Sequence, residues 1–145
     1  PHDRSVRTES GGCLKTRVYI AAPLGRASDA NDFADMLLVA DGYEIVSRWH
    51  RTVKAGAVDP SDPEACAALH EANKLDIRRA DLMVVVRPAG GKTTYVEAGI
   101  AEERGVPVLW FCPGGEGRCL ASRHVVESLD RFFPKLRALS ERWAA

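Results

Sequence analysis

Glu97 is the acidic residue whose position in the sequence best suits nucleophilic chemistry. It lies within Thr94-Tyr95-Val96-Glu97-Ala98-Gly99, which we place in the first turn of a helix. A carboxylate near the positive end of a helix is favourable there without any function. The same carboxylate could instead serve as a nucleophile or a base, because Ala98 and Gly99 are small enough for a ligand to approach. Spacing alone leaves both roles open.

A glycine-rich turn, Gly90-Gly91-Lys92-Thr93-Thr94, leads from an apolar run into that helix. Backbone N–H groups and the helix dipole favour an anion at such a position, so the turn could bind a phosphate or a sugar. A Walker A loop would need glycine at the position of Val86, which lies inside the apolar run. The structural alternative is a tight turn in which Thr93 or Thr94 caps the helix.

Tyr19, Trp49 and His50 are further candidates. Tyr19 lies inside an apolar, β-branched segment, where a tyrosine is usually part of the core. Trp49 and His50 follow another short segment of this kind and could form an aromatic wall and a polar contact for a flat base. Alternatively, Trp49 folds over the end of the sheet and His50 is a structural hydrogen-bonding residue.

Strand and helix patterns alternate along the chain. The predicted strands are residues 17–22, 43–47, 82–86, 106–111 and 124–127. One predicted helix covers residues 30–40 after a Ser28-Asp29 cap, and a second covers residues 63–79 after a cap at Ser61 or Asp62. A third begins at Thr93 or Thr94 and ends near Arg104, and the last starts near residue 128, with a kink or break at Pro134. Residues 48–63 are predicted to be a loop. This alternation predicts a parallel sheet with helices on both faces.

In such sheets, ligands bind beyond the carboxyl ends of the strands, near the switch in strand order. Four segments meet this description: the loop after Ala22, residues 48–50, the turn at 87–94 and the loop at 112–117. Asp81 lies at the other end of its strand, so we interpret it as structural.

The composition of the chain argues against a nucleic-acid-binding protein and against a membrane protein. The chain has 145 residues, which predicts one domain. Its 20 Lys and Arg residues equal its 20 Asp and Glu residues, whereas proteins that bind nucleic-acid polymers usually carry a basic excess. No apolar run approaches the roughly 20 residues that span a bilayer, and the N-terminus lacks the apolar segment of a signal peptide. We therefore expect a cytoplasmic protein with a small-molecule ligand and no membrane or nucleic-acid partner.

Residues 1–12 are polar and begin with Pro1. We interpret them as a leader added for expression or left by trimming, and residues 13–145 as a single domain. The four cysteines, Cys13, Cys66, Cys112 and Cys119, form no zinc-binding pattern. Free thiols in a reducing compartment are the main interpretation, and a Cys112–Cys119 disulfide in an oxidising compartment is the alternative.

Several segments, in their order, resemble the nucleoside 2-deoxyribosyltransferase family and its nucleotide N-glycosidase relatives. The matching segments are Val18-Tyr19-Ile20-Ala21-Ala22-Pro23, His70-Glu71-Ala72-Asn73 through Ala80-Asp81, Tyr95-Val96-Glu97-Ala98-Gly99 and Gly105-Val106-Pro107-Val108-Leu109. The resemblance covers residues 17–112. It implies a flavodoxin-like three-layer sandwich, with a five-stranded parallel sheet in the order 2-1-3-4-5. It also implies a homodimer or larger homo-oligomer in which a neighbour completes the active site.

The resemblance further implies a reaction. Family members cleave the N-glycosidic bond of (deoxy)nucleosides or nucleotides: a glutamate attacks C1′ of the sugar, the base leaves, and a second base or water resolves the glycosyl-enzyme. Glu97 matches that nucleophile, and Tyr19 matches the tyrosine that orients it. No metal or other cofactor is implied. The residues expected to bind the substrate are Ala22, Pro23, Gly25, Arg26, Trp49, His50, Gly90, Gly91, Lys92, Thr93 and Thr94.

Asn73 departs from the family's pattern. The family commonly has an aspartate there, which helps to handle the proton of the leaving base, and an amide cannot act as a general acid. Asp76, one helical turn later, could take over this role, or the base could leave unassisted. The alternative function is a non-catalytic nucleotide-binding module of the same fold.

Pro23 is a second departure, because the nucleotide-specific relatives have a serine at this position. A 5′-phosphate could still be bound by Lys92, Thr93, Thr94 and Arg26. The sequence therefore leaves open whether the substrate is a nucleoside or its monophosphate.

Overall fold

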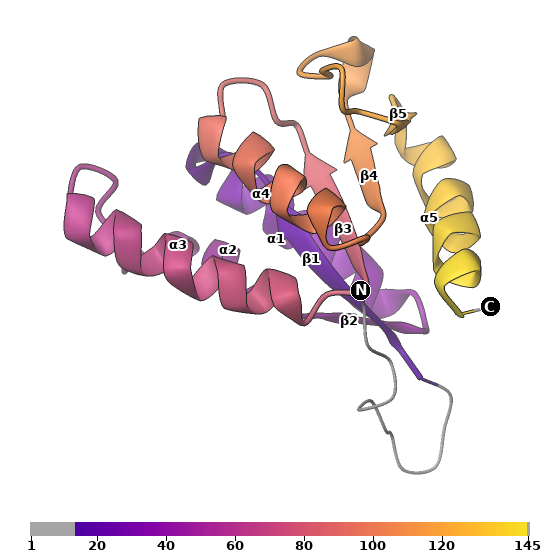
Figure 1. Cartoon of the computed structure of the whole chain (residues 1–145), viewed down its shortest axis with the longest axis horizontal. Helices are drawn as coiled ribbons and strands as arrows, with labels where there is room; N and C mark the ends of the chain where they lie inside the picture. Colours follow the sequence, from indigo (N-terminus) through magenta and orange to yellow (C-terminus); the bar gives the residue numbers. More distant parts are fainter. Residues whose placement is uncertain (1–13, 145) are drawn as a thin grey trace.

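The computed structural model describes residues 14–144, so the predicted leader and Cys13 lie outside the described residues. Within them, the chain forms a sheet of five strands: β1 (Thr16–Ala21), β2 (Tyr43–Ile45), β3 (Leu82–Val86), β4 (Val108–Phe111) and β5 (His124–Val126). Neighbouring strands are all parallel, in the order β2-β1-β3-β4-β5 (Figure 1). The predicted fold class and strand order are therefore confirmed.

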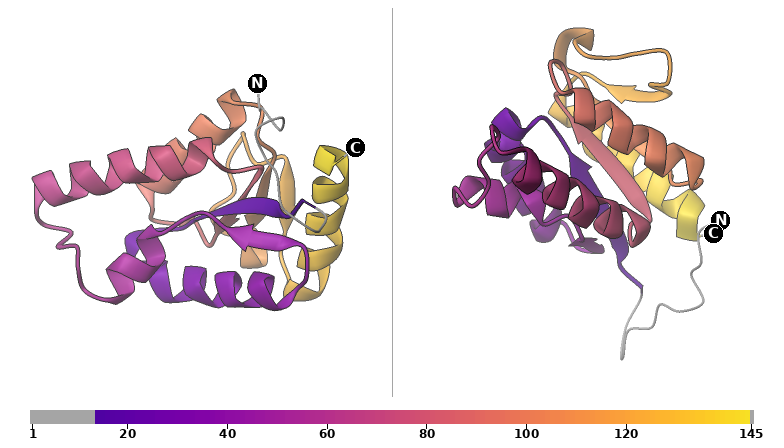
Figure 2. Two further views of the ribbon diagram at one scale, coloured as in Figure 1. Left: turned by 90° about the horizontal axis from the view of Figure 1, so that it is seen from below. Right: turned by 60° about the vertical axis from the view of Figure 1, so that its left-hand side comes forward.

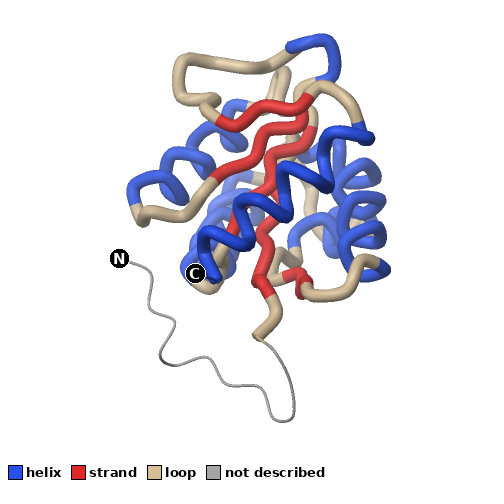
Figure 3. The backbone as a smooth tube through the Cα atoms, turned by 90° about the vertical axis from the view of Figure 1, so that its right-hand side faces the viewer, coloured by secondary structure: helices blue, strands red, loops and turns tan. Residues whose placement is uncertain are grey.

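Helices cover both faces of this sheet. Helices α1 (Ala27–Val39) and α5 (Leu129–Ala144) lie on one face, and α3 (Pro63–Arg78) and α4 (Lys92–Glu103) lie on the other (Figure 2). The strands are also seen between helices in Figure 3. A short helix, α2 (Trp49–Lys54), follows β2, and the 3-10 turns η1 (Leu24–Arg26) and η2 (Pro113–Gly115) follow β1 and β4. The result is a three-layer sandwich.

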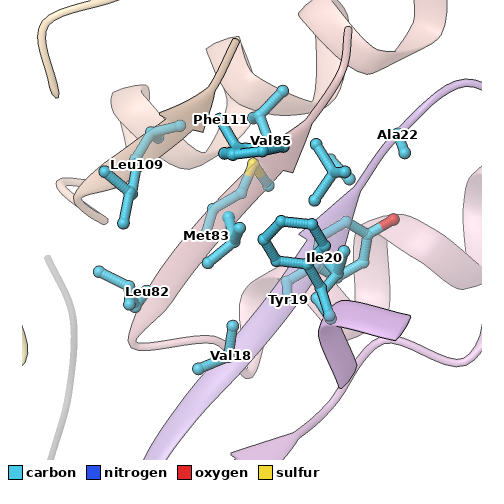
Figure 4. Packing of buried hydrophobic residues seen from close by; sticks show 14 of the residues in the cluster. Val18, Tyr19, Ile20, Ala22, Leu82, Met83, Val85, Leu109 and Phe111 are labelled. Carbon is cyan, nitrogen blue, oxygen red and sulfur yellow. The ribbon is translucent and has the colours of Figure 1, made fainter. Parts of the chain in front are cut away.

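Apolar strands build the core of the sandwich. Every residue of β3 is buried, because helices cover both faces of this central strand. Figure 4 shows side chains of β1, β3 and β4 packed together. On the α1 side, the ring of Phe33 lies with its centroid 5.0 Å from that of Phe111 in β4 and 5.1 Å from that of Phe132 in α5. These aromatic contacts join two helices to the sheet.

The segment after β2 differs from its prediction. Residues 49–54 form helix α2, whereas a loop was expected from residue 48 onward. The indole Nε1 of Trp49 donates to the carbonyl of Ile20 across 2.7 Å, which holds the start of α2 against β1. A single helical turn is too short to give a clear periodic signal, so tertiary contacts rather than propensity decide this helix.

Helix α1 begins at Ala27, after η1, and neither Ser28 nor Asp29 caps it. Asp29 instead pairs with Arg26 across 3.2 Å. Helix α3 confirms one of the two predicted caps, because the Asp62 side chain accepts from the backbone N–H groups of Glu64 and Ala65.

Helix α5 continues through Pro134, so of the two predicted outcomes, a kink or a break, the break is wrong. The ring of Pro134 removes one backbone hydrogen bond near the start of the helix. Phe132, Leu136 and Leu139 are all buried against the sheet, and this apolar stripe holds the helix together on both sides of the proline.

Cys66, Cys112 and Cys119 are free thiols, so the alternative Cys112–Cys119 disulfide is not formed. Among the described residues, no helix combines the length and the apolar character needed to cross a bilayer.

Candidate active site

A cavity of about 490 Å³ lies at the carboxyl ends of β1 and β3. This is the edge where ligands of parallel sheets bind, and the volume is within the range of small-molecule sites. The loop after β1, the start of α2, one face of α3 and the beginning of α4 surround it. Its lining residues are Ala22, Pro23, Leu24, Gly25, Trp49, Cys66, Leu69, His70, Asn73, Gly90, Gly91, Lys92, Thr93, Thr94, Val96 and Glu97.

Glu97 lies in the second turn of α4 rather than in the first, where it was predicted. It therefore lies beyond the unpaired N–H groups that would stabilise its charge. The side chain is only 4% exposed. Burial raises the pKa of Glu97 to about 7, and hydrogen bonding by Asn73 and the influence of Tyr19 oppose this rise. A buried carboxylate that lines a cavity and titrates near neutrality suits catalysis better than a solvated helix face.

Asn73 extends from α3 to Glu97. Its Nδ2 donates to Oε2 of Glu97 across 3.1 Å, and both groups are buried. This hydrogen bond favours the ionised form of the carboxylate and leaves the other carboxylate oxygen without a contact to Asn73. Asn73 thus acts on the candidate nucleophile itself, in addition to lining the cavity.

The hydroxyl of Tyr19 is buried and has no hydrogen-bond partner among the described residues. It does not reach hydrogen-bonding geometry with Glu97, yet it lies close enough to influence that carboxyl group. Burial, followed by the charge of Glu97, raises the pKa of Tyr19. The phenol therefore stays protonated and can donate to Glu97 after a small movement. Figure 4 shows its ring among the buried side chains of the sheet.

Asp76 does not line this cavity. It borders a second hollow between α2 and α3, where Arg48 holds it through Nη2 at 2.8 Å and Nε at 3.1 Å. The Asp76 side chain is 2% exposed, whereas that of Arg48 is 66% exposed. An ion-paired carboxylate outside the cavity is not placed to protonate a leaving base. Its charge lies close enough to Tyr19 to contribute to the raised pKa of that phenol.

Trp49 and His50 are neighbours in the sequence, but only one of them faces the cavity. Trp49 lines the cavity, as expected. His50 does not: its Nδ1 lies 2.8 Å from Oδ1 of Asn31, and its Nε2 lies 2.8 Å from Oγ of Ser47. Because the amide oxygen of Asn31 can only accept, the neutral ring donates from Nδ1 and accepts from the Ser47 hydroxyl. Burial lowers the pKa of His50 to about 4, so His50 is a structural residue.

The glycine-rich turn brings the loop after β1 and the start of α4 together. A Cβ atom on Gly91 would lie 2.6 Å from Cγ of Pro23 and 2.7 Å from Oγ1 of Thr94. Helix α4 begins at Lys92, and its N-terminal cap is Gly91, with no side-chain capping bond. The prediction that Thr93 or Thr94 caps the helix is therefore wrong. Lys92 and Thr93 are exposed at the mouth of the cavity.

Arg26 is not placed at the cavity. It lies in η1, pairs with Asp29, and borders a small separate hollow. The remaining expected binding residues, Ala22, Pro23, Gly25, Gly90, Gly91, Lys92, Thr93 and Thr94, all line the cavity. Asp81, interpreted as structural, is fully buried at the start of β3 and accepts from the backbone and the guanidinium of Arg17.

Sequence reasoning gave no role to Cys66, Leu69 or His70, which also line the cavity. Together with Asn73, they occupy one face of α3, because they are separated by three or four residues. The helical spacing could have indicated these residues in advance. Once Asn73 is placed in a site, the residues one and two helical turns before it face the same site.

No group of three or more His, Cys, Asp or Glu side chains that could hold a metal ion occurs in the part of the chain that the structure describes. The polar groups that line the cavity include the carboxylate of Glu97, the amide of Asn73, the imidazole of His70 and the exposed Lys92, whereas Tyr19 lies close to Glu97 and does not line it. Such a set can supply a nucleophile, hydrogen bonds and protons.

Comparison with known proteins shows the fold. No family model matches the sequence. No curated protein matches it either. Among solved structures, the CMP N-glycosidase BcmB of Clostridium botulinum is similar, with a TM-score of 0.53 and 15% sequence identity, over 85% of this chain and 99% of the other. The chain is therefore similar to a nucleotide N-glycosidase in fold.

Proposed function

We propose that this protein cleaves the N-glycosidic bond of a nucleoside 5′-monophosphate or nucleoside, with Glu97 as the nucleophile. The observation that carries the proposal is the buried Glu97 carboxyl group at the cavity, held by Asn73 and close to the Tyr19 hydroxyl. The similarity in fold to a CMP N-glycosidase supports it.

The reaction follows the logic of a retaining glycosidase. The ionised Glu97 attacks C1′, a bond forms between its oxygen and that carbon, and the C1′–N bond breaks with its electron pair going to the base. Water then attacks C1′ of the glycosyl-enzyme and releases Glu97. If a second base attacks instead of water, the product is a new nucleoside and the reaction is a transfer.

Each neighbour of Glu97 has a role in this scheme. Asn73 favours the ionised form through its hydrogen bond, and Tyr19 can orient the free carboxylate oxygen. Because the cavity excludes most solvent from Glu97, its carboxylate is poorly hydrated and more reactive toward a carbon with oxocarbenium character. The pKa of about 7 keeps a useful fraction ionised at neutral pH.

The start of α4 is the candidate position for the 5′-phosphate. The unpaired N–H groups of its first turn and the ammonium of Lys92 suit an anion, and both border the cavity that holds Glu97. Trp49 offers an aromatic surface for the base. We further propose a homodimer or higher homo-oligomer, as the resemblance implies, and a cytoplasmic location, as the polar N-terminus suggests.

The second candidate is a nucleotide-binding module without turnover. Asn73 favours it, because the position lacks the carboxyl group of the resembling enzymes. The two candidates agree on the ligand and differ on whether the glycosidic bond breaks.

Base release tests both candidates. The protein is incubated with ribo- and deoxynucleosides and their 5′-monophosphates, with and without a second free base, and products are followed by chromatography. We expect base release by the natural protein and none by Glu97→Gln. Glu103→Gln, which changes an exposed carboxylate on the same helix, is the matched control and should be fully active. Binding without release in every sample would favour the module.

A further inference from the structure

Two buried side-chain polar atoms lack a hydrogen-bond partner among the described residues: the Tyr19 hydroxyl and Nδ1 of His70. His70 lies on α3, one helical turn before Asn73, and lines the same cavity as Glu97. A buried, unpaired ring nitrogen costs free energy unless a partner is present in some functional state. Because the His70 side chain also lines the cavity, a turn of its ring brings this nitrogen to a ligand bound there.

The proposed reaction lacks a proton donor for the departing base. Asn73 cannot supply a proton, because its amide is not an acid at any relevant pH. Asp76 lies in the second hollow and is paired with Arg48. Tyr19 has its pKa raised by burial and the charge of Glu97, which makes it a poor acid. None of these three residues can therefore donate the proton that the family's aspartate is expected to supply.

The other titratable groups at the cavity, apart from His70, are also poorly placed to donate a proton to the departing base. Lys92 is exposed at the mouth of the cavity. The thiol of Cys66 lies 3.4 Å from the backbone carbonyl of Pro60, so it points toward the loop before α3. His70 remains, and an imidazole is the side chain whose ordinary pKa best suits proton transfer near neutral pH.

We infer that His70 is the general acid that protonates the departing base, a role that rests on the proposed function. As Glu97 bonds to C1′, the C1′–N electron pair moves to the base, and the imidazolium of His70 gives its proton to the base, which leaves neutral. His70 is then a neutral imidazole. It takes a proton from the water that attacks C1′, which restores both the imidazolium and the free Glu97 carboxylate.

The charges around His70 are compatible with this cycle. From α4, Glu97 and Lys92 face the cavity. On its own helix, the neighbouring Glu71 is paired with Lys74 across 2.7 Å and also interacts electrostatically with His70. The cavity-lining residues of the loop after β1, of η1 and of α2 are Ala22, Pro23, Leu24, Gly25 and Trp49, none of which carries a charge. Glu97 is the carboxylate that lines the cavity together with His70, and it is consumed as an ester when His70 must release its proton.

The test compares two leaving groups. A natural nucleotide that the protein cleaves needs protonation of its base, whereas its methylated counterpart already carries a positive charge and leaves as a neutral base. N3-methylcytidine monophosphate serves for cytosine, and N7-methylguanosine monophosphate serves for guanine. We expect His70→Gln to lower kcat about 100-fold or more on the natural nucleotide, and less than about 5-fold on the methylated one.

The pH profile gives a second readout. A general acid must be protonated, so kcat of the natural protein should fall on the alkaline side, and His70→Gln should lack this alkaline fall. Glu103→Gln, which changes an exposed carboxylate on α4, is the control and should keep both the rate and the profile. Thermal unfolding of each variant shows whether the fold is intact.

Several results would overturn the inference. The first is a loss of kcat in His70→Gln that is equal on both nucleotides, and the second is no loss of kcat on either. The third is a fall of kcat at alkaline pH that persists in His70→Gln. If the methylated nucleotide is not a substrate, the pH profile alone decides. Glu97→Gln distinguishes the two proposals, because it should abolish cleavage of both substrates. If the natural protein cleaves nothing, the proposed function fails and the role of His70 fails with it.

Discussion

Asn73 and Glu97 meet across the cavity, with Nδ2 of Asn73 3.1 Å from Oε2 of Glu97. This contact joins α3 to α4 through two buried polar groups. The position that departs from the resembling family therefore touches the candidate nucleophile and supports its ionised form. An aspartate here would place a second carboxyl group beside Glu97, whereas the amide adds a donor without a charge.

Removing that donor should make Glu97 harder to ionise. In Asn73→Ala, one hydrogen bond to the carboxylate is lost, which corresponds to about one pH unit. We expect the acidic limb of the kcat/KM profile to move upward from about pH 7 by roughly that amount. Kinetics between pH 5 and 9 would measure it. Lys74→Ala changes the next residue on α3 and should leave the limb in place; an unshifted limb in Asn73→Ala would show that the contact does not tune Glu97.

The raised pKa of Glu97 also predicts how stability depends on pH. The ordinary pKa is 4.5 and the folded value is about 7, so the folded protein binds this proton more tightly than the unfolded chain. The contribution of Glu97 to the free energy of unfolding is therefore fully present below pH 4.5 and is lost as pH rises through 7. Each tenfold difference in proton affinity corresponds to about 1.4 kcal/mol, so the loss amounts to about 3 kcal/mol.

Urea unfolding of Glu97→Gln at pH 4.5 and pH 8 measures this contribution. The variant should gain stability relative to the natural protein as pH rises, because it has no carboxylate to ionise. A stability difference that stays constant across this range would mean that Glu97 titrates normally in the folded protein.

His50 should act in the opposite sense. Its pKa is lowered from 6.5 to about 4 by burial, so the folded protein favours the neutral ring. The stability that His50 contributes is present above pH 6.5 and is lost as pH falls through 4. NMR of labelled histidine side chains should show a neutral His50 ring at pH 5, with the proton on Nδ1. A ring that titrates near pH 6.5 would contradict the buried contacts with Ser47 and Asn31.

Gly91 should be required for the shape of the cavity. In Gly91→Ala, the new Cβ would meet the rigid ring of Pro23 at 2.6 Å, so the loop after β1 or the start of α4 must shift. We expect a stability loss of about 1–3 kcal/mol and a fall in kcat/KM of about tenfold or more, because small displacements of positioning groups slow catalysis strongly.

Gly99→Ala is the matched control on the same helix. Nothing lies within 4 Å of a Cβ atom at that position, and alanine in a helix interior is more stable than glycine by about 0.5–1 kcal/mol. The two substitutions should therefore change stability in opposite directions. A Gly91→Ala variant as stable and active as the natural protein would show that Pro23 and α4 do not pack as described.

The sheet could be predicted because its signals are local. The central strands β3 and β4 are short apolar runs, helical patterns alternate with the strands, and this alternation is typical of a parallel sheet. The glycine-rich turn and the loop after β1 meet as predicted, because the carboxyl ends of β1 and β3 lie side by side. The place of Asn73 beside Glu97 was implied by the family resemblance alone.

What sequence reasoning missed depends on which side chains pair with one another in the folded chain. His50 is turned from the cavity by Asn31 in α1 and Ser47 after β2. Arg26 forms an ion pair with Asp29 and does not line the cavity. His70 becomes notable only when its ring nitrogen is found buried beside the cavity without a partner. Helical spacing could have placed His70 at the cavity, but the pairing of His50 and Arg26 and the missing partner of the His70 nitrogen become visible only in the structure.

The most direct test of the central claim is to trap the glycosyl-enzyme. A nucleotide with fluorine at C2′ slows both steps, because fluorine destabilises the oxocarbenium-like transition state, and an activated base restores the first step. Intact-mass measurement should then show the natural protein heavier by one fluorinated sugar phosphate, with the added mass on the peptide that contains Glu97. Base release without any adduct, together with full activity in Glu97→Gln, would contradict the account.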